Sequence, residues 1–407
     1  MDIVSPVAAS LMGLTLPAAR QISWLDDQSS SLGGNHAGPV FAATGKPHIA
    51  RQPPRRPARI GLMTRNPLEG WAVDRAGIRY LGENLERPEC ILAEPDGTLW
   101  SADGRGGVVR IAPDGSQRLI LQSTARRNDS SSFEERYVNT MGSLPNGLAF
   151  DADGNFLIAN FGTDSLELMA RDGTTRTLVD NIDGNPVGKA NFVTRDGKGR
   201  LWLTVTTRMV PWTRHVETMS HDGYIALIDE RGVRIVADGL CGTNELRFDP
   251  AEEYLYVAET TRRRISRFRV LADGALGPRE THGPENVGGF CDGIAFDSHG
   301  NLWSTLIMAD RLIAITPEGE VLVLLDDGRP EATAALDAAW HEGCVTPDLM
   351  AAATGTIAPW MASLTFGGPD LRTVYLGSLR GSRIPCFRSP VAGLPLIYWN
   401  ERKTVAA

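Results

Sequence analysis

The sequence has 407 residues with 42% hydrophobic and 22% charged side chains, a balance typical of globular proteins that excludes intrinsic disorder, collagen and coiled coil. The formal net charge is −8 and the acids and bases are interspersed, so we expect neither nucleic acid nor a membrane surface as a partner. The 43 glycines and 25 prolines favour many short strands joined by tight turns over long helices.

Residues 1–60 differ in composition from the rest of the chain. Residues 51–59 read RQPPRRPAR, and prolines at this density are incompatible with a helix or a central strand. We therefore predict a leader or packing arm over residues 1–60 and a catalytic domain over residues 61–407. No run of 18 apolar residues occurs, and the first residues lack the positive charge typical of a signal peptide. We expect a cytoplasmic protein with reduced cysteines; a cleaved leader is the alternative.

A repeat that begins near residue 79 decides the predicted fold. Each copy starts with a polar residue, runs through a short apolar stretch, turns at Asp, Gly or Asn, and re-enters an alternating strand with Trp, Phe or Tyr, which is the pattern of a β-hairpin. The copies occupy residues 88–103, 145–160, 190–205, 243–258, 291–306 and, more loosely, 362–378. Further strand pairs lie between the copies, so each repeating unit has four strands.

Six four-stranded units cannot bury both of their faces alone, whereas radial stacking covers the faces and protects the edges. We therefore predict an all-β fold, a six-bladed β-propeller with four-stranded blades and an N-terminal extension, over a sandwich or a solenoid. We expect a strand from residues 71–85 to close the ring by completing the sheet built from residues 372–400. The Ala-rich segment between residues 330 and 359 is predicted to form a short helix in a loop between blades.

The innermost strands of a propeller line its central channel, so the polar residue near the start of each repeat is expected at one mouth of that channel. In register, these residues are Glu89, Asn146, Asn191, Asn244 and Asp292. Their oxygens suit a hard cation, Ca²⁺ first and otherwise Mg²⁺, Mn²⁺ or Zn²⁺, and two facing acids without a cation would repel until one held a proton. A turn residue that bonds its own backbone is the alternative at any single position, but the shared phase across five blades favours a site.

Four segments also carry a resemblance to a known family. They are RPECILAEPDGTLWSAD (87–103), NELRFDPAEEYLYVAET (244–260), DGIAFDSHGNLW (292–303) and SLTFGGPDLRTVYLGS (363–378). They are similar to the senescence marker protein, gluconolactonase and luciferin-regenerating enzyme-like family, and the likeness extends over about residues 70–400. Cys90 and Glu245 depart from it, because each stands where that family often has glycine.

The resemblance implies a six-bladed propeller with one catalytic divalent ion, calcium or zinc in many members, and hydrolysis of a lactone or related ester. The residues that would hold the ion are Glu89, Asn191, Asn244 and Asp292. The expected mechanism is attack by a metal-activated water on the carbonyl of a small-molecule lactone.

Asp292 is predicted to act as both ligand and general base, ionised at neutral pH beside the metal. The resemblance places a basic substrate-orienting residue at Lys189, and Trp212 and His215 are lid candidates in the long loop after the third repeat. Asn146 is the remaining candidate for a substrate contact, although it could also serve as a ligand.

Two further readings stay open at this point. One is lyase or isomerase chemistry on the same divalent ion, because a fold does not fix a reaction. The other is a non-catalytic propeller that binds calcium or another ligand. The motifs GxSxG and HExxH, a P-loop and a dinucleotide-binding GxGxxG after a strand are absent from the sequence, which removes the enzyme classes that depend on them.

Overall fold

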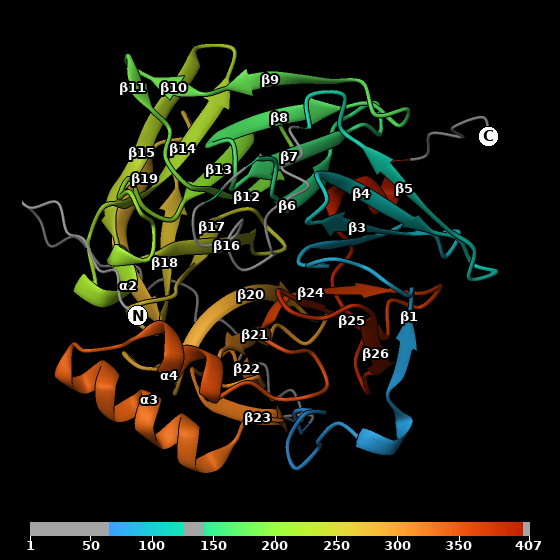
Figure 1. The fold of residues 1–407 in the computed structure, drawn as a ribbon, viewed down its shortest axis with the longest axis vertical. Helices are drawn as coiled ribbons and strands as arrows, with labels where there is room; N and C mark the ends of the chain where they lie inside the picture. Colours follow the sequence, from blue (N-terminus) through green and yellow to red (C-terminus); the bar gives the residue numbers. More distant parts are fainter. Residues whose placement is uncertain (1–64, 126–139, 141, 402–407) are drawn as a thin grey trace, which may run out of the picture. The chain divides into compact units, whose positions relative to one another are not determined.

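The structure is a computed structural model of the 407-residue chain, and it describes residues 65–125, 140 and 142–401. The chain divides into two units, residues 1–62 and 63–407, and all described residues lie in the second. The predicted leader over residues 1–60 lies outside the described residues. In the second unit the described residues form six four-stranded antiparallel sheets arranged as the blades of a β-propeller (Figure 1). The predicted fold class is confirmed.

The strands of each blade are hydrogen-bonded in chain order, with one exception at the closure of the ring. Blade 1 contains β2 (Ile91–Ala93), β3 (Leu99–Asp103), β4 (Gly107–Ile111) and β5 (Gln117–Leu121). Blade 2 contains β6 (Pro145–Phe150), β7 (Phe156–Asn160), β8 (Ser165–Met169) and β9 (Thr175–Val179). Blade 3 contains β12 (Ala190–Arg195), β13 (Leu201–Val205), β14 (Gly223–Asp229) and β15 (Gly232–Leu240).

The remaining blades follow the same plan. Blade 4 contains β16 (Thr243–Phe248), β17 (Tyr254–Glu259), β18 (Arg264–Val270) and β19 (Leu276–His282). Blade 5 contains β20 (Phe290–Phe296), β21 (Leu302–Ile307), β22 (Arg311–Ile315) and β23 (Val321–Asp326). Blade 6 contains β24 (Met361–Gly367), β25 (Thr373–Ser378), β26 (Ile384–Arg388) and β1 (Arg79–Leu81).

The ring closes as predicted, by pairing an early strand with the last blade. β1 lies antiparallel to β26, with Arg79 opposite Cys386. A bridge between Asp297 and Gly393 ties the C-terminal part of the chain to blade 5. The early and late parts of the propeller are therefore held in one sheet.

Burial follows each strand's place in its blade. Strands near the channel, such as β20, are buried along their whole length, because each is covered on both faces by neighbouring blades. Outer strands such as β5 and β23 keep exposed positions. The first strands of successive blades contact one another around the axis.

The turn of the repeat is fixed by a hydrogen bond between its acid and the aromatic residue that follows. In blade 5, Trp303 Nε1 donates to Asp297 Oδ2 at 2.8 Å, and the same carboxylate accepts the backbone amides of His299 and Asn301. In blade 3, Trp202 Nε1 donates to Asp196 Oδ2 at 2.9 Å. The acid and the tryptophan of the repeat therefore anchor the hairpin turn to the blade.

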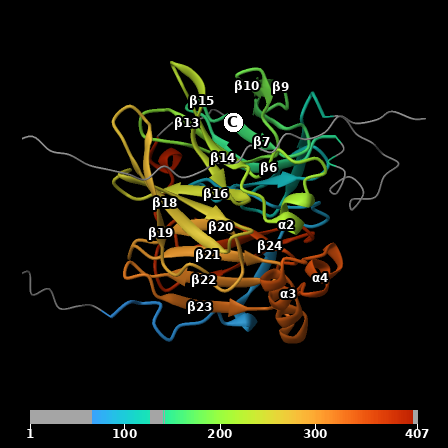
Figure 2. The same ribbon diagram turned by 90° about the vertical axis from the view of Figure 1, so that its left-hand side faces the viewer.

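The helical elements among the described residues are few. They are η1 (Arg75–Gly77), α2 (Arg214–Thr218), α3 (Pro330–Glu342), α4 (Pro347–Ala352) and η2 (Ile397–Asn400), and a two-stranded ribbon, β10 (Asn181–Ile182) with β11 (Asn185–Pro186), extends from blade 2. The helix predicted in the Ala-rich segment is present as α3 and α4. Figure 2 places α2, α3 and α4 on one side of the ring and the red C-terminal turn on the other.

Two further predictions concern membrane segments and cysteines. Within the described ranges, none of the helices is long and apolar enough to cross a membrane. All five cysteines lie in the described part of the chain and are free thiols, as predicted, and only Cys344 is exposed. The cytoplasmic location stays a prediction.

Candidate functional site

The first strands of blades 2 to 5 each carry a register irregularity at the predicted site residue. The shifts fall between Pro145 and Leu148 in β6, Ala190 and Phe192 in β12, Thr243 and Leu246 in β16, and Cys291 and Ile294 in β20. A β-bulge breaks the alternation of a strand and re-aims a side chain. Each of these intervals contains one of the predicted polar residues, and these residues line a shared cavity.

A cavity of about 50 Å³ opens at this mouth of the channel, and all five register positions line it. They are Glu89, Asn146, Asn191, Asn244 and Asp292. Each of the five is at most 8% exposed. The structure therefore brings together side chains that the sequence separates by up to 203 positions.

Four of these side chains carry a buried oxygen that accepts no hydrogen bond within the described residues. Within the described residues, the oxygens that lack a hydrogen-bond partner include Glu89 Oε2, Asn191 Oδ1, Asn244 Oδ1 and Asp292 Oδ1. The orientation of Asn244 is fixed, because its amide nitrogen donates to Thr260 Oγ1 at 3.2 Å. Buried oxygens without donors are costly unless another group compensates them, and a hard cation is such a group.

Asn146 differs from these four, because both ends of its amide are engaged. Its Nδ2 donates to Glu89 Oε1 and to the backbone oxygen of Asn191, each at 3.0 Å, and its Oδ1 accepts from Arg87. Asn146 therefore holds Glu89 in place, while Glu89 Oε2 has no hydrogen-bond partner within the described residues. This arrangement is that of a supporting residue.

Arg87 was not among the residues predicted from the sequence, but it lines the cavity and is 2% exposed. Its Nη1 donates to the backbone oxygen of Pro145 at 2.9 Å. Its φ of 53° lies in the left-handed region, which residues other than glycine rarely adopt and which tends to be retained at functional sites. The signal available in the sequence was its register: Arg87 stands two residues before Glu89, as Lys189 stands two residues before Asn191.

Lys189 does not line the cavity. Its Nζ lies 2.7 Å from Asp164 Oδ1 and donates to Thr140 Oγ1 at 2.9 Å. The ammonium is therefore engaged beside the site, and the cation facing the cavity is Arg87. The predicted substrate contact of Lys189 gains no support from this geometry.

Close approach between blades explains why glycine follows the site residue in blades 2 and 5. A Cβ on Gly147 would lie 2.5 Å from Phe192 Cα, and one on Gly293 would lie 2.6 Å from a backbone oxygen of blade 6. In blade 4 the equivalent position is Glu245, which is fully buried and forms an ion pair with Arg247 Nη2 at 3.0 Å. This departure from glycine adds a third carboxylate, close enough to the two site acids to raise their pKa values.

Burial and neighbouring charges raise the pKa of both site acids. Burial raises the pKa of Glu89 well above its ordinary value, Arg87 opposes this, and Asp292 and Glu245 raise it further. Burial and, to a smaller extent, Glu245 raise the pKa of Asp292 from 3.8 to about 8, although the positive charge of Arg87 lowers it. Without a cation, Asp292 therefore holds a proton at neutral pH, in line with the repulsion expected from the sequence. A bound cation would favour their ionised forms.

Trp212 and His215 both line the cavity and are buried. His215 Nδ1 lies 2.8 Å from the carbonyl oxygen of Trp212, so Nδ1 donates and the other ring nitrogen is the acceptor in the neutral ring. Burial lowers the pKa of His215, which favours that neutral form. Trp212 packs edge to face on Phe161, with ring centroids 5.5 Å apart.

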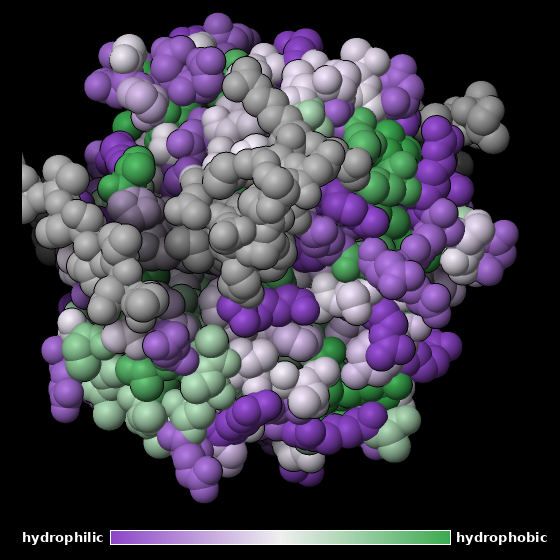
Figure 3. Space-filling view, viewed as in Figure 1, coloured by the Kyte–Doolittle hydropathy of each residue, from purple (hydrophilic) through white to green (hydrophobic). Residues whose placement is uncertain are grey.

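The helices extend this apolar wall. Trp212 and Phe161 belong to one buried cluster with Leu336 of α3 and Met350 of α4. Trp340 of α3 donates from Nε1 to the backbone oxygen of Thr261, a cavity residue, at 2.8 Å. Figure 3 shows the surface over α3 and α4 largely in pale green, which marks hydrophobic residues. The site therefore combines a polar floor with an apolar rim.

No cluster of three or more His, Cys, Asp or Glu side chains able to hold a metal occurs in the part of the chain that the structure describes. The candidate set has two acids and two amides, so its fit to a cation rests on the four unpaired oxygens. Calcium and magnesium sites commonly combine carboxylate and amide oxygens in this way.

A six-bladed propeller with acids and amides converging on one channel mouth defines the class of this protein. The chain belongs to the family described as SMP-30/Gluconolactonase/LRE-like, whose region matches residues 119–334, more than half of the chain. The resemblance stated from the sequence is thereby confirmed.

Curated relatives are similar over part of their length. A 6-deoxy-6-sulfogluconolactonase of Pseudomonas putida is 27% identical over 213 residues, which cover 51% of this chain and 60% of that protein. Strictosidine synthase-like 4 of Arabidopsis thaliana is 25% identical over 57% of this chain and 60% of that protein. The mouse adipocyte plasma membrane-associated protein is 25% identical over 62% of this chain and likewise 60% of that protein. The chain thus spans about three fifths of each relative.

Solved structures share the fold. A gluconolactonase from Xanthomonas campestris superposes with a TM-score of 0.53 at 20% identity over 76% of this chain and 88% of that one. A luciferin-regenerating enzyme superposes with a TM-score of 0.56 at 15% identity over 79% of this chain and 98% of that one. The calcium-binding protein regucalcin from Agrobacterium tumefaciens superposes with a TM-score of 0.54 at 15% identity over 78% of this chain and 96% of that one.

Proposed function

We propose that this protein is a divalent-metal-dependent lactonase that opens a small-molecule lactone or cyclic ester. The observation that carries the proposal is the set of four buried oxygens at one channel mouth, on Glu89, Asn191, Asn244 and Asp292, which lack protein donors within the described residues. Lactonase-type function is supported by membership of the gluconolactonase family and by the Pseudomonas putida relative.

The four side chains would hold one cation, and their chemistry favours Ca²⁺, with Mg²⁺ or Mn²⁺ next. Regucalcin, which has the same fold, is described as calcium-binding. Zinc is less favoured, because no thiol lines the cavity among the described residues and burial raises the pKa of the Cys90 and Cys291 thiols, which keeps them protonated.

When bound, such an ion supplies Lewis-acid polarisation of a carbonyl and acidification of a water. Asp292 is the proposed general base, because its carboxylate lies in the cavity and its pKa can be tuned across the neutral range by neighbouring charge. Arg87 provides a buried positive charge that opposes the negative charge of the two acids. The neutral His215 ring offers a hydrogen-bond acceptor at the rim.

The apolar rim indicates the kind of lactone. The cavity is lined by hydrophobic side chains at Phe161, Trp212, Val216, Phe290, Ile307, Met308 and Leu379. Two of its three threonine hydroxyls are engaged: Thr206 donates to the backbone oxygen of Thr243 and Thr260 to that of Cys291, which leaves Thr261. A sugar lactone would bring several hydroxyls to a wall with few open partners, and unpaired buried hydroxyls are unfavourable. We therefore propose a lactone with an apolar substituent.

The direct test is hydrolysis measured by base titration on δ-decalactone, dihydrocoumarin and glucono-1,5-lactone, with added Ca²⁺ and with chelator. The proposal expects metal-dependent turnover that is fastest on the first two substrates and at least hundredfold slower in Asp292→Asn. Glu318→Gln, on an exposed turn of blade 5, is the matched control and should retain full activity.

The outcomes separate the parts of the proposal. Turnover on glucono-1,5-lactone alone would overturn the apolar substrate and keep the lactonase. Bound metal without hydrolysis of any substrate would instead favour a non-catalytic binding propeller or another reaction on the ion.

A further inference from the structure

A second and larger cavity, of about 390 Å³, lies at the opposite end of the same channel. Every first strand contributes to it, but through later residues than those that line the candidate site, for example Leu148 of β6 and Phe296 of β20. Its size falls within the range of roughly 300 to 1,000 Å³ typical of small-molecule sites. The proposed lactonase assigns it no role.

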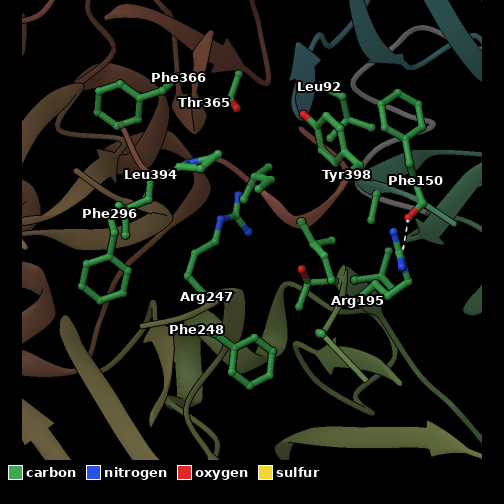
Figure 4. Close-up of a pocket in the computed structure, with 18 of the residues that line it drawn as sticks. Leu92, Phe150, Arg195, Arg247, Phe248, Phe296, Thr365, Phe366, Leu394 and Tyr398 are labelled. Atoms are coloured by element: carbon green, nitrogen blue, oxygen red, sulfur yellow. Dashed lines mark hydrogen bonds between the residues drawn. The ribbon is translucent and has the colours of Figure 1, made fainter. Parts of the chain in front are cut away.

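The walls of this second cavity are mainly apolar, with two buried arginines, Arg195 and Arg247. Figure 4 shows the Arg247 side chain rising from β16 into the middle of the cavity, between Leu394 and Tyr398. Arg247 is 8% exposed, and its guanidinium stacks on the Phe192 ring with the carbon 4.4 Å from the ring centroid. The rest of the lining is dominated by leucine and phenylalanine side chains.

The guanidinium of Arg247 is only partly satisfied. Nη1 donates to the backbone oxygen of Leu246 at 2.9 Å, and Nη2 lies 3.0 Å from Glu245 Oε2 on the channel side. Nε is buried and has no hydrogen-bond partner within the described residues. A buried charged donor without an acceptor is unfavourable, so the cavity presents a specific demand for an acceptor oxygen.

The acids that also line the second cavity are engaged elsewhere. Asp249 Oδ1 accepts the backbone amides of Glu253 and Tyr254 at 2.8 and 3.2 Å. Glu252 Oε1 accepts the amide of Gly197 at 2.8 Å. Both carboxylates therefore fix the backbone of the rim, and neither pairs with Arg247.

The C-terminal segment forms one side of the mouth. Leu394 donates its amide to the backbone oxygen of Phe296, and Tyr398 donates from its hydroxyl to the backbone oxygen of Ala93 at 2.9 Å. Arg195 Nη1 donates to Glu401 Oε1 at 2.9 Å, so this second arginine of the cavity is already neutralised. Arg247 is paired with Glu245, but its Nε donor has no partner within the described residues and is therefore the group left to meet a ligand.

We propose that this second cavity binds a monocarboxylate with an apolar body, whose carboxylate accepts the Nε–H of Arg247 and whose body packs on the leucine and phenylalanine walls. A carboxylate suits this place better than a neutral oxygen, because hydrogen bonds between two charged groups are stronger than neutral ones. The alternative occupant is water, which would satisfy Nε without selectivity for an anion.

The test is isothermal titration calorimetry of the full chain with octanoate, and with octanamide as the matched neutral probe. Two variants address the second cavity. Leu394→Trp fills its mouth without touching the ion pair, and Arg247→Lys keeps a positive charge opposite Glu245 but removes the Nε donor. Asp292→Asn alters the candidate lactonase site at the other end of the channel and serves as the control.

The proposal expects saturable one-to-one binding of octanoate to the wild type and to Asp292→Asn, with octanamide at least tenfold weaker. Leu394→Trp should weaken octanoate binding at least tenfold, and so should Arg247→Lys; if the latter does not fold, Leu394→Trp decides. Absence of saturable octanoate binding would overturn the proposal and leave water as the occupant of the cavity. Equal binding of the two probes, binding unchanged in the folded variants, or binding lost in Asp292→Asn would each overturn the proposal.

Discussion

Asn146 Nδ2 lies 3.0 Å from Glu89 Oε1 and joins the first strand of blade 2 to the segment that precedes the first strand of blade 1. Because the same amide accepts from Arg87 and donates to the backbone of Asn191, one side chain positions three parts of the candidate site. The proposed metal affinity should therefore depend on a residue that does not itself contact the ion.

Replacing Asn146 tests this dependence. Asn146→Ala should lower Ca²⁺ affinity by about 10- to 100-fold, the usual effect of removing a group that orients a ligand. Calorimetric titration of the two proteins measures the difference. Asn181→Ala, at an exposed position outside the channel, should bind as the wild type does. Equal affinity in Asn146→Ala would show that Glu89 needs no such support.

The raised pKa of Asp292 predicts that metal binding releases protons. The ordinary value is 3.8 and the folded, metal-free value is about 8, so between these pH values the folded protein holds a proton that a bound cation would displace. Ca²⁺ affinity should rise with pH up to about 8, and titrations at pH 7 in buffers of different ionisation enthalpy should show proton release. Asp292→Asn should release fewer protons; an identical count would exclude Asp292 as their source.

The same shift predicts the pH dependence of stability. A carboxyl whose pKa is raised on folding binds more protons in the folded state, so the free energy of unfolding of the metal-free protein falls as pH rises from about 4 to about 8. Saturating Ca²⁺ should reduce this fall, because the cation replaces the proton. Thermal melting at pH 5 and pH 8, with and without Ca²⁺, checks both statements. A metal-free melting temperature that increases over this interval would contradict them.

Glu245 is predicted to raise the pH at which the site binds Ca²⁺. Its charge raises the pKa of Glu89 and of Asp292, so its removal should let Ca²⁺ bind at lower pH. The double variant Glu245→Gln with Arg247→Met removes the ion pair as a unit and avoids leaving a buried charge alone. The midpoint pH of Ca²⁺ binding should fall by about one unit. A midpoint that stays in place would remove Glu245 from the account.

Asp297 tests the turn that builds the blades. Its fully buried carboxylate accepts from Trp303 Nε1, His299 N and Asn301 N, so Asp297→Ala leaves several donors without partners. We expect a loss of about 3 kcal/mol in the free energy of unfolding. Asp151→Ala, at the equivalent but more exposed turn of blade 2, should cost less in chemical denaturation. Equal losses would mean that burial does not set the cost.

The fold was predictable because its determinants are local and repeated. Acid and tryptophan lie six residues apart in one hairpin, as Asp196 and Trp202 do, and this spacing alone specifies the turn. The phase of the polar residues predicted their convergence, because every blade uses the same strand for the channel. The pairing of β1 with β26 was predictable because the last blade needs a fourth strand, which an early segment can supply.

The partners of individual side chains were less accessible to sequence reasoning. Lys189 and Arg87 occupy the same register in different blades, but Lys189 meets Asp164 while Arg87 faces the cavity. That difference depends on loops beside each strand. The second cavity depends on the path of the C-terminal segment over Tyr398, which no repeat encodes.

The proposed metal site is tested most directly by anomalous scattering from a crystal soaked with Mn²⁺. One strong peak is expected at the channel mouth, within about 2.5 Å of oxygens of Glu89, Asn191, Asn244 and Asp292. The peak should be absent from a crystal of Asp292→Asn. A peak bound by other residues, or an empty channel mouth at saturating Mn²⁺, would contradict the account.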